Sequence, residues 1–425
     1  MDEKIITSIV CPGCGCLCDD IDVQLSGGSI VQINNVCSWG IGRFVDRKKF
    51  ANKKERKRPD GHYTRINGAR KSVPLDEACQ LAADVIRAAK RVLIYGLCQS
   101  GNRAQARIYR LGKKLGATFI PSEGPLVTMF LEQFKQNGLS LCTLEDVRNR
   151  ADVVVFWGAN PIHSCPRLVS RYALFARGRF TERGEEDRKA FIIDLHPTEL
   201  TKVCNEAILK DGDDLALLRA LRTLLNGEKP EEYGTVKPKQ ARELAKALEE
   251  GLYIAFFCGR GPFYGNDGKK FLKEMVDLVA YLNEKANCVL LPLATDFNTM
   301  GFYHTILRDG DCDVLGKSLM YDVRDWKPRK GDVVIGLGSD FIWFLSDEQK
   351  VRMRTKDVKV ISISSYETLT HVNCTVALSC AMAGIEVDDL AYRLDSLPVK
   401  LKGIRKPMLP ADWEILERLE TSLKI

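Results

Sequence analysis

The sequence predicts an α/β protein in which a small cysteine-rich unit precedes two doubly wound α/β domains. Five cysteines lie within the first 37 residues, and short apolar segments alternate with helical segments after residue 73. Hydrophobic residues make up 45% of the 425-residue chain, which is ample for ordinary buried cores. We expect an N-terminal iron-sulfur-type domain with a basic connector over residues 1–73 and an α/β region of two interleaved subdomains over residues 74–425.

The N-terminal unit contains a predicted hairpin followed by a strongly basic stretch. Residues 21–36 alternate apolar and polar side chains around Gly27 and Gly28, which predicts two strands and a turn. The basic run can meet nucleic acid, an acidic partner or an anionic cofactor tail. No nucleic-acid module accompanies it, so we favour a solvated loop or a contact with a partner protein. The run comprises Arg47, Lys48, Lys49, Lys53, Lys54, Arg56, Lys57 and Arg58.

The remaining chain alternates helices with short apolar strands, as a parallel sheet covered on both faces requires. Gly-rich turns such as WGANP, CGRGPFYG and GLGSD follow three of the strands, at the edge where open sheets bind ligands. Residues 225–240 predict a surface connection. We expect helices over residues 74–90, 100–116, 214–225 and 269–286, and strands over residues 91–97, 151–158, 189–195, 252–259, 332–340 and 358–365.

Four of the early cysteines have the spacing of an iron-sulfur ligand set. Cys11, Cys14 and Cys18 are separated by two and three residues, and Cys37 follows eighteen residues later. Four thiolates are the number that a [4Fe-4S] cluster needs, whereas structural zinc sites usually draw ligands from two short-spaced pairs. We predict a [4Fe-4S] cluster at these four residues, with a zinc site and a vacant relic as alternatives and Cys16 as a bystander.

Composition also excludes several classes of protein. Fifteen cysteines without an export signal favour a cytoplasmic protein with free thiols, and no stretch approaches the roughly 20 apolar residues of a membrane span. The chain has no His-x-His pair, no His-Glu-x-x-His motif and no nucleophile elbow, so we expect no hydrolase of its own. His163 and His196 predict hydrogen-bonded structural side chains.

Motifs at both ends and in the middle carry a resemblance. CPGCGCLCDDI and WGANP are similar to segments of the molybdopterin oxidoreductases, while residues 383–404 and 409–419 resemble the C-terminal end of the formylmethanofuran dehydrogenase B subunits. The resemblance implies a cluster-bearing unit and two α/β domains without the superfamily's C-terminal β-barrel domain. It further implies reversible reduction of carbon dioxide to a formyl group on methanofuran, at a molybdopterin that holds molybdenum or tungsten.

Three positions depart from the family pattern at the metal. The family holds its metal with a cysteine or selenocysteine followed by a histidine, and the aligned residues here are Ser122 and Glu123. The family's distant arginine aligns with Ala294, and a Lys-Gly pair after the fourth cysteine aligns with Trp39 and Gly40. We therefore expect a lost redox site at Ser122, Glu123 and Ala294, and no catalytic residue in this chain.

A further set of positions matches the pterin-dinucleotide side of the superfamily cleft. The resemblance implies either contacts with a pterin or an inherited scaffold, because a parallel-sheet crevice needs a turn and a small residue in both cases. The matching residues are Trp157, Gly158, Asn160 and Arg167, and more loosely Asp194 and Thr198.

These observations lead to three hypotheses. The first is a non-redox scaffold of the bacterial formyltransferase/hydrolase complex, which moves a formyl group from tetrahydromethanopterin to a methanofuran-like carrier and hydrolyses it. Its expected partners are an amidohydrolase-like A subunit, a C subunit, a formyltransferase subunit and, through the complex, the carrier, with no nucleic acid and no membrane. The second is an active dehydrogenase subunit whose metal is held by Ser122 or by a cysteine such as Cys98. The third is an electron-transfer module that keeps only the cluster.

Overall fold

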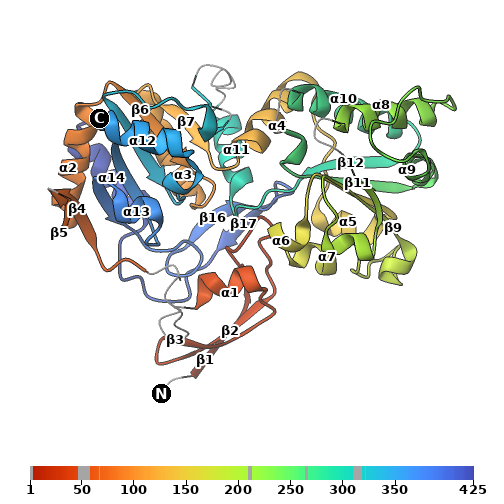
Figure 1. The fold of residues 1–425 in the computed structure, drawn as a ribbon. Helices are drawn as coiled ribbons and strands as arrows, with labels where there is room; N and C mark the ends of the chain where they lie inside the picture. The colour runs from red at the N-terminus through yellow and green to blue at the C-terminus, as the bar shows by residue number, and fades with distance from the viewer. Residues whose placement is uncertain are drawn as a thin grey trace. The chain divides into compact units, whose positions relative to one another are not determined.

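A computed structural model describes residues 3–45, 58–66, 68–208, 213–263, 267–309, 318–320 and 322–425. The chain forms two compact units (Figure 1). Unit 1 comprises Met1–Thr128, Asp296–Arg393 and Pro398–Ile425, and unit 2 comprises Met129–Thr295 and Leu394–Leu397. These compact units do not follow the domain boundary expected at residue 73. The division into domains at that residue stays a prediction. Helix α4 (Gly124–Asn137) runs across the boundary in the sequence.

The N-terminal segment of unit 1 forms a three-stranded antiparallel sheet of order β1-β2-β3. The predicted hairpin is confirmed, because β2 pairs with β3 through a turn at Gly27 and Gly28. Both glycines have positive φ angles, +57° and +78°, a conformation that glycine adopts without a steric penalty. The elements are β1 (Glu3–Ile9), β2 (Ile21–Ser26), β3 (Ser29–Asn34) and the following helix α1 (Ser38–Phe44).

The main sheet of unit 1 has seven strands in the order β5-β4-β15-β14-β13-β6-β7. The strands from β15 to β7 are parallel, while β4 and β5 form an antiparallel hairpin at one edge. The predicted strands at residues 91–97, 332–340 and 358–365 are confirmed. The strands are β4 (His62–Ile66), β5 (Ala69–Val73), β6 (Arg91–Gly96), β7 (Thr118–Pro121), β13 (Asp332–Leu337), β14 (Lys359–Ser364) and β15 (Val376–Ser379).

The end of the expected connector is therefore part of this sheet, which corrects the sequence interpretation. The backbone of β4 pairs with β15, and the Tyr63 side chain is buried in the core beneath the sheet. Arg58 also has an internal role, since it pairs with the buried carboxylate of Glu386 and donates to the Ser365 carbonyl at 2.8 Å. The other seven residues of the basic run lie outside the described residues.

Helices cover this sheet, and the predicted helices over residues 74–90 and 100–116 are confirmed. The C-terminal helix α14 packs against α2 and α3, and α3 also packs against α11 and strand β16 (Figure 1). The helices are α2 (Leu75–Arg87), α3 (Asn102–Lys114), α11 (Thr299–Arg308), α12 (Asp347–Thr355), α13 (Leu369–Asn373) and α14 (Asp412–Leu423), with 3-10 turns η6 (Val323–Asp325) and η7 (Ile342–Phe344).

A small apolar cluster fixes the cysteine loop within unit 1. Val10 and Leu17, which flank the first cysteines, pack with Phe297, Ala391 and Leu401. Ala391 and Leu401 belong to the antiparallel pair β16 (Asp389–Tyr392) and β17 (Pro398–Leu401). Segments from both ends of the sequence therefore hold this loop in place.

Unit 2 contains a five-stranded parallel sheet of order β10-β9-β8-β11-β12. Every residue of β8 and β11 is buried, as expected for central strands covered on both faces. The strands are β8 (Val153–Trp157), β9 (Lys189–Asp194), β10 (Asn205–Ile208), β11 (Tyr253–Cys258) and β12 (Asn287–Pro292). The predicted strands at residues 151–158, 189–195 and 252–259 are confirmed.

The helices of unit 2 confirm the predictions over residues 214–225 and 269–286, and the connection between α8 and α9 falls where it was expected. The elements are α5 (Leu144–Arg150), α6 (Pro161–Ser164), α7 (Arg167–Arg171), α8 (Asp214–Leu225), α9 (Pro238–Glu250) and α10 (Gly268–Leu282), with η2 (Gly184–Asp187), η3 (Glu199–Lys202) and η4 (Gly261–Phe263).

The α/β class is thus confirmed for both units, and a cysteine-rich loop lies near the N-terminus. Within the ranges that the structure describes, no helix has the length and apolar character needed to cross a membrane.

Candidate functional site

The first three predicted cluster ligands lie on a loop that closes on itself. The backbone N–H of Cys11 donates to the Cys18 carbonyl at 2.8 Å, and that of Leu17 donates to the Cys14 carbonyl at 3.1 Å. Leu17 has a φ of +40°, so the tight turn requires a left-handed residue. Cys11, Cys14 and Cys18 are all buried, which keeps their sulfurs inside the loop.

The fourth predicted ligand approaches from helix α1. Cys37 caps this helix, and its sulfur accepts the Gly40 N–H at 3.4 Å. Burial, and after it the neighbouring Cys14 and Cys18 thiols and more weakly Cys37, raises the pKa of the Cys11 thiol well above its usual range. The structure therefore brings the four predicted ligands close enough to influence one another electrostatically.

Two glycines let the backbone pack closely against the Cys11 sulfur. A β-carbon at Gly13 would lie 3.1 Å from this sulfur, and one at Gly40 would lie 2.8 Å from it. Four neighbouring thiols with side-chain-free backbone beside one of them fit a thiolate-bound cluster. Cys16, the expected bystander, is fully buried with its sulfur within 4.8 Å of the Cys14 sulfur. The assignment of the cysteines as ligands stays a prediction.

The position expected to have lost its metal ligand is part of a hydrogen-bonded chain. Ser122 follows β7, and its hydroxyl donates to the Asp296 carboxylate at 2.6 Å while its backbone N–H donates to the Gly96 carbonyl at 2.8 Å. The Gln99 amide donates to the same carboxylate, and Arg43 on α1 donates to Gln99. The serine side chain therefore serves as a hydrogen-bond donor within the protein.

The neighbouring position is also occupied by a protein contact. Glu123 is only 1% exposed, and its carboxylate accepts the Asp296 backbone N–H at 3.2 Å and the Thr299 hydroxyl. This carboxylate consequently fixes the start of α11 against the start of α4. A histidine at the same position has no side-chain oxygen. Its neutral ring offers one acceptor nitrogen, so it could not replace the carboxylate as the acceptor of both hydrogen bonds.

Cys98, the alternative metal ligand, lies beside Ser122. Burial, and after it the carboxylates of Asp296 and Glu123, raises the pKa of the Cys98 thiol, while a hydrogen bond with Ser122 opposes this shift. The structure therefore brings both side chains of the alternative dehydrogenase hypothesis together.

Sequence reasoning missed Arg43, Gln99 and Asp296. Arg43 lies one helical turn after Trp39, which is 46% exposed, and its guanidinium lies over the Tyr366 ring at 5.5 Å. The sequence signal for Arg43 was its spacing. It lies four residues after Trp39, the position aligned with the family lysine, and residues four apart share one face of a helix. For Asp296 the signal was an acid two residues beyond Ala294 in the segment expected to carry an arginine.

Ala294 itself belongs to unit 2 and contributes no polar side chain. It is 1% exposed, its N–H donates to the Pro292 carbonyl at 3.0 Å, and its carbonyl accepts from the Cys165 thiol at 3.4 Å. The residue therefore acts as a buried turn residue of unit 2, while its alignment with the family arginine stays a prediction.

The turn after β8 holds the first two predicted pterin-side residues. The Trp157 indole is fully buried, and its N–H donates to Asp214 at 2.6 Å. Gly158 has a φ of +57°, and a β-carbon there would lie 2.2 Å from the Cδ of Pro262. The small residue is therefore required for packing of this turn against the turn after β11, whether or not a ligand binds.

The other predicted residues lie at the surface of unit 2. Asn160 caps α6, and its amide donates to Glu199 at 3.0 Å, while His163 contacts the same carboxylate at 2.9 Å. These hydrogen bonds, with that of Asn160 the stronger, lower the pKa of Glu199 to about 2. Arg167 begins α7, and Thr198 caps η3. The hydrogen-bonded role expected for His163 is confirmed, and pterin contacts stay a prediction.

Two positions at the end of β9 were matched more loosely. Asp194 accepts the Leu195 N–H at 2.7 Å, and burial raises the pKa of its carboxyl. His196 is exposed. This geometry makes Asp194 a turn residue and gives no support to a special function for His196.

Comparisons with known proteins extend over the whole chain. It is 27% identical over 449 residues to the B subunit of tungsten-containing formylmethanofuran dehydrogenase 2 from Methanocaldococcus jannaschii, covering 99% of both proteins. It is 26% identical to the protein of the same name from Methanococcus maripaludis, covering 98% of both. No protein-family model matches the chain.

The fold also matches a chain of known structure. That chain belongs to the crystal structure of the formyltransferase/hydrolase complex FhcABCD from Methylorubrum extorquens with methylofuran. The TM-score is 0.63 at 18% identity, with 86% of this chain and 99% of that chain covered. The fold is therefore shared with a chain of this complex, and over its whole length the chain is similar to the B subunits of tungsten-containing formylmethanofuran dehydrogenases.

Proposed function

We propose that this chain is a non-redox, B-like scaffold subunit of a multi-subunit complex in tetrahydromethanopterin- and methanofuran-linked C1 metabolism. The observation that carries this proposal is the hydrogen bond from Ser122 to Asp296 at the position where the family holds its metal. A serine that donates to a carboxylate is a poor replacement for a soft thiolate ligand. Formyl transfer and amide hydrolysis need nucleophile activation and charge stabilisation, which partner subunits would supply.

The similar proteins support membership in such a complex. Two relatives are subunits of tungsten-containing formylmethanofuran dehydrogenases, and the fold is shared with a formyltransferase/hydrolase complex that binds methylofuran. The proposal includes an amidohydrolase-like A subunit, a C subunit and a formyltransferase subunit as partners. It also includes two molybdopterin oxidoreductase-like α/β domains without the C-terminal β-barrel domain, and a cytoplasmic location that would keep the many thiols reduced.

A [4Fe-4S] cluster belongs to the same proposal. Cys11, Cys14, Cys18 and Cys37 would hold it, and when bound it would supply one-electron transfer or structural cross-linking of the loop. Around it, the absence of side chains at Gly13 and Gly40 lets the backbone approach the Cys11 sulfur, while the Gly40 N–H donates to the Cys37 sulfur. Hydrogen bonds to a ligand sulfur stabilise its negative charge.

The alternative function is an active dehydrogenase subunit, and one specific contact favours it. The Cys98 thiol lies beside Ser122, so a soft donor is present near the lost ligand position. In that case Cys98 or Ser122 would hold molybdenum or tungsten on a pterin, and Trp157, Gly158, Asn160 and Arg167 would contact the pterin dinucleotide. The extended hydrogen-bond network around Asp296 favours the scaffold function over this dehydrogenase function.

Metal analysis of the native complex separates these functions. The complex is purified anaerobically with its partner subunits, and iron, zinc, molybdenum and tungsten are measured per chain. We expect iron near four per chain beyond that of the partners, without molybdenum or tungsten. Stoichiometric molybdenum or tungsten would contradict the scaffold and support the dehydrogenase. A reversible one-electron signal in the absence of pterin would instead favour an electron-transfer module.

A further inference from the structure

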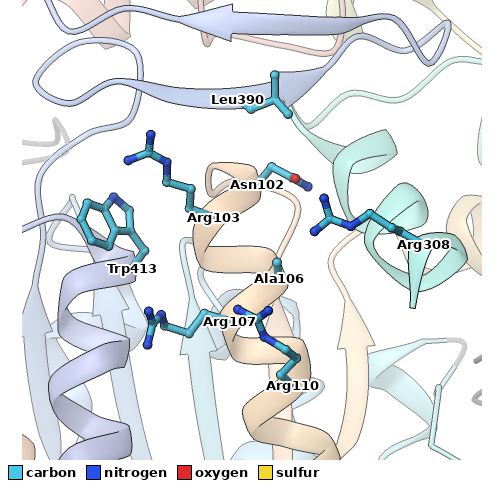
Figure 2. A pocket seen from close by; sticks show the side chains of 8 residues that line it. All are labelled: Asn102, Arg103, Ala106, Arg107, Arg110, Arg308, Leu390 and Trp413. Carbon is cyan, nitrogen blue, oxygen red and sulfur yellow. The ribbon is translucent and has the colours of Figure 1, made fainter. Parts of the chain in front are cut away.

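A pocket of about 400 Å³ lies in unit 1, outside the sites described above (Figure 2). Helices α3, α11 and α14 and strand β16 form its walls. Four arginines line it, three from α3 and one from α11, together with a tryptophan from α14. These residues are Arg103, Arg107, Arg110, Arg308 and Trp413. A pocket of this size is typical of small-molecule sites, which span about 300–1,000 Å³.

One of the four arginines is neutralised by the protein. Arg107 pairs with Glu420 at 2.6 Å and with Glu417 at 3.3 Å, both on α14. This pairing ties α14 to α3 and explains why an arginine lies at this position. The positive charge of the pocket therefore comes from the other three guanidinium groups.

The side chains of Arg103, Arg110 and Arg308 form no ion pair within the part of the chain that the structure describes, although the Asp389 carboxylate is near enough to Arg103 to interact with it electrostatically. Asp309, the neighbour of Arg308 in the sequence, pairs with Lys113 at 2.8 Å. The Asp389 carboxylate accepts the backbone N–H of Arg103 at 3.2 Å and is buried at the start of α3. The pocket is therefore electropositive.

Trp413 provides a second, independent observation. Its indole N–H is buried and has no hydrogen-bond partner, although its ring lies under the Arg103 guanidinium at 5.4 Å. A buried donor without a partner is unfavourable. The Trp413 ring also supports the Arg103 guanidinium at the wall of the pocket through a cation–π contact.

We propose that this pocket binds a small organic anion that carries a phosphate or carboxylate group. Arg110 and Arg308 hold the anionic group, because a guanidinium presents parallel N–H donors that match two oxygens of either group. Ala106 and Leu390 line the remaining wall and contact the apolar part of the ligand. This site is independent of the proposed scaffold function and of the cysteine loop.

Calorimetry on the native complex tests the site with phenyl phosphate as the probe. We expect saturable binding that the double variant Arg110→Gln/Arg308→Gln weakens at least about tenfold, since each charged hydrogen bond contributes on the order of 1.5–3 kcal/mol. Arg242→Gln, which removes an exposed arginine from α9 in unit 2, serves as the matched control and leaves the affinity unchanged. Circular dichroism checks the fold of each variant.

Further probes distinguish the sources of the anion and need no variant. Benzoate tests recognition of a carboxylate, and inorganic phosphate tests recognition of a phosphate without an apolar part. Phenol has the ring of phenyl phosphate but no negative charge, so it tests whether the charge is needed. Sulfate is expected to compete with phenyl phosphate in the unaltered complex. Absence of saturable binding by all anions, equal binding of phenol, unchanged binding in the double variant, or binding of a glutamate-rich peptide alone would each overturn the proposal.

Discussion

Two regions of unit 1, the cysteine loop and the surroundings of Ser122, differ in how their polar side chains are arranged. Around the cysteine loop, the Cys14, Cys18 and Cys37 thiols act electrostatically on that of Cys11, and the backbone at Gly13 and Gly40 packs closely against the Cys11 sulfur. At Ser122 the expected ligand position contains a hydroxyl that donates to Asp296, and Gln99 donates to the same carboxylate. The first region therefore has neighbouring thiols beside bare backbone, whereas the second has donors and acceptors that satisfy one another.

The difference teaches how a metal site and a structural polar network can be distinguished without a bound metal. A metal site needs several donors directed at common space, and an added methyl group there would meet a ligand atom. A structural network pairs each donor with an acceptor, because burial of an unpaired polar group is costly. Four expected outcomes test this contrast, from the largest effect to the smallest.

The largest effect is expected from Gly40→Ala. Its β-carbon would lie 2.7 Å from the Val36 Cγ2 and 2.8 Å from the Cys11 sulfur, so the predicted ligand would be pushed out of position. We expect loss of most of the iron and of the visible absorption of the purified complex. Gly61→Ala is the matched control, because no heavy atom lies within 4 Å of its β-carbon. Full iron content in Gly40→Ala would mean that the position of the Cys11 sulfur does not matter for holding the cluster.

A large pH effect is expected at Asp412, a buried carboxyl outside the network of Ser122 and Asp296. Burial, and after it the Asp389 carboxylate, raises the pKa of Asp412 to about 7. Since the unfolded pKa is near 4, the folded state binds the extra proton between about pH 4 and 7, and the free energy of unfolding falls as pH rises through this window. A shift of about three units corresponds to a ceiling on the order of 4 kcal/mol.

Denaturant unfolding of Asp412→Asn at a series of pH values checks this expectation. The variant should lack the decline, so that it gains stability relative to the unaltered protein between about pH 4 and 7. Asp325→Asn removes an exposed carboxylate from η6 and provides a control for the change in charge. Parallel pH profiles of Asp412→Asn and the unaltered protein would show that Asp412 is ionised in the same range when folded and unfolded.

A smaller loss is expected from Asp296→Ala, which removes the acceptor of Ser122 and Gln99. We expect a decrease of about 2 kcal/mol in the free energy of unfolding, because two donors lose a charged acceptor. Asp277→Ala, whose side chain is 52% exposed and pairs with Lys273, should change the free energy by less than about 0.5 kcal/mol. Equal effects of both variants would argue against a structural network at Asp296.

The smallest effect is expected from Ser122→Ala. The hydroxyl makes one strong hydrogen bond, so its removal should cost about 1 kcal/mol, and the iron content should not change. Formyl turnover by the complex should also persist, because no catalytic step is assigned to this residue. A complete loss of turnover in a folded complex would move the function toward an active site at Ser122.

Local pattern predicted most of the regular structure. The apolar segments at β8 and β11 and the amphipathic segments at α2, α3 and α10 lie where their periodicity indicates, since burial on two faces or one face imposes those patterns. The edge hairpin of β4 and β5 was missed. Its short polar strands are stabilised by backbone pairing with β15, about 300 residues later, which no local pattern reveals.

The sequence by itself determined the alternation of strands and helices and the cysteine spacing, and it led to the prediction that Ser122 and Glu123 replace metal-binding residues of the family. Only the tertiary structure decided that Ser122, Gln99 and Asp296 meet, and that α3, α11 and α14 gather arginines around one pocket. The physical reason is the distance along the chain over which each kind of interaction acts. Periodicity and turn chemistry act over a few neighbouring residues, whereas hydrogen-bond networks and pockets join segments whose separation in the chain leaves no local signal.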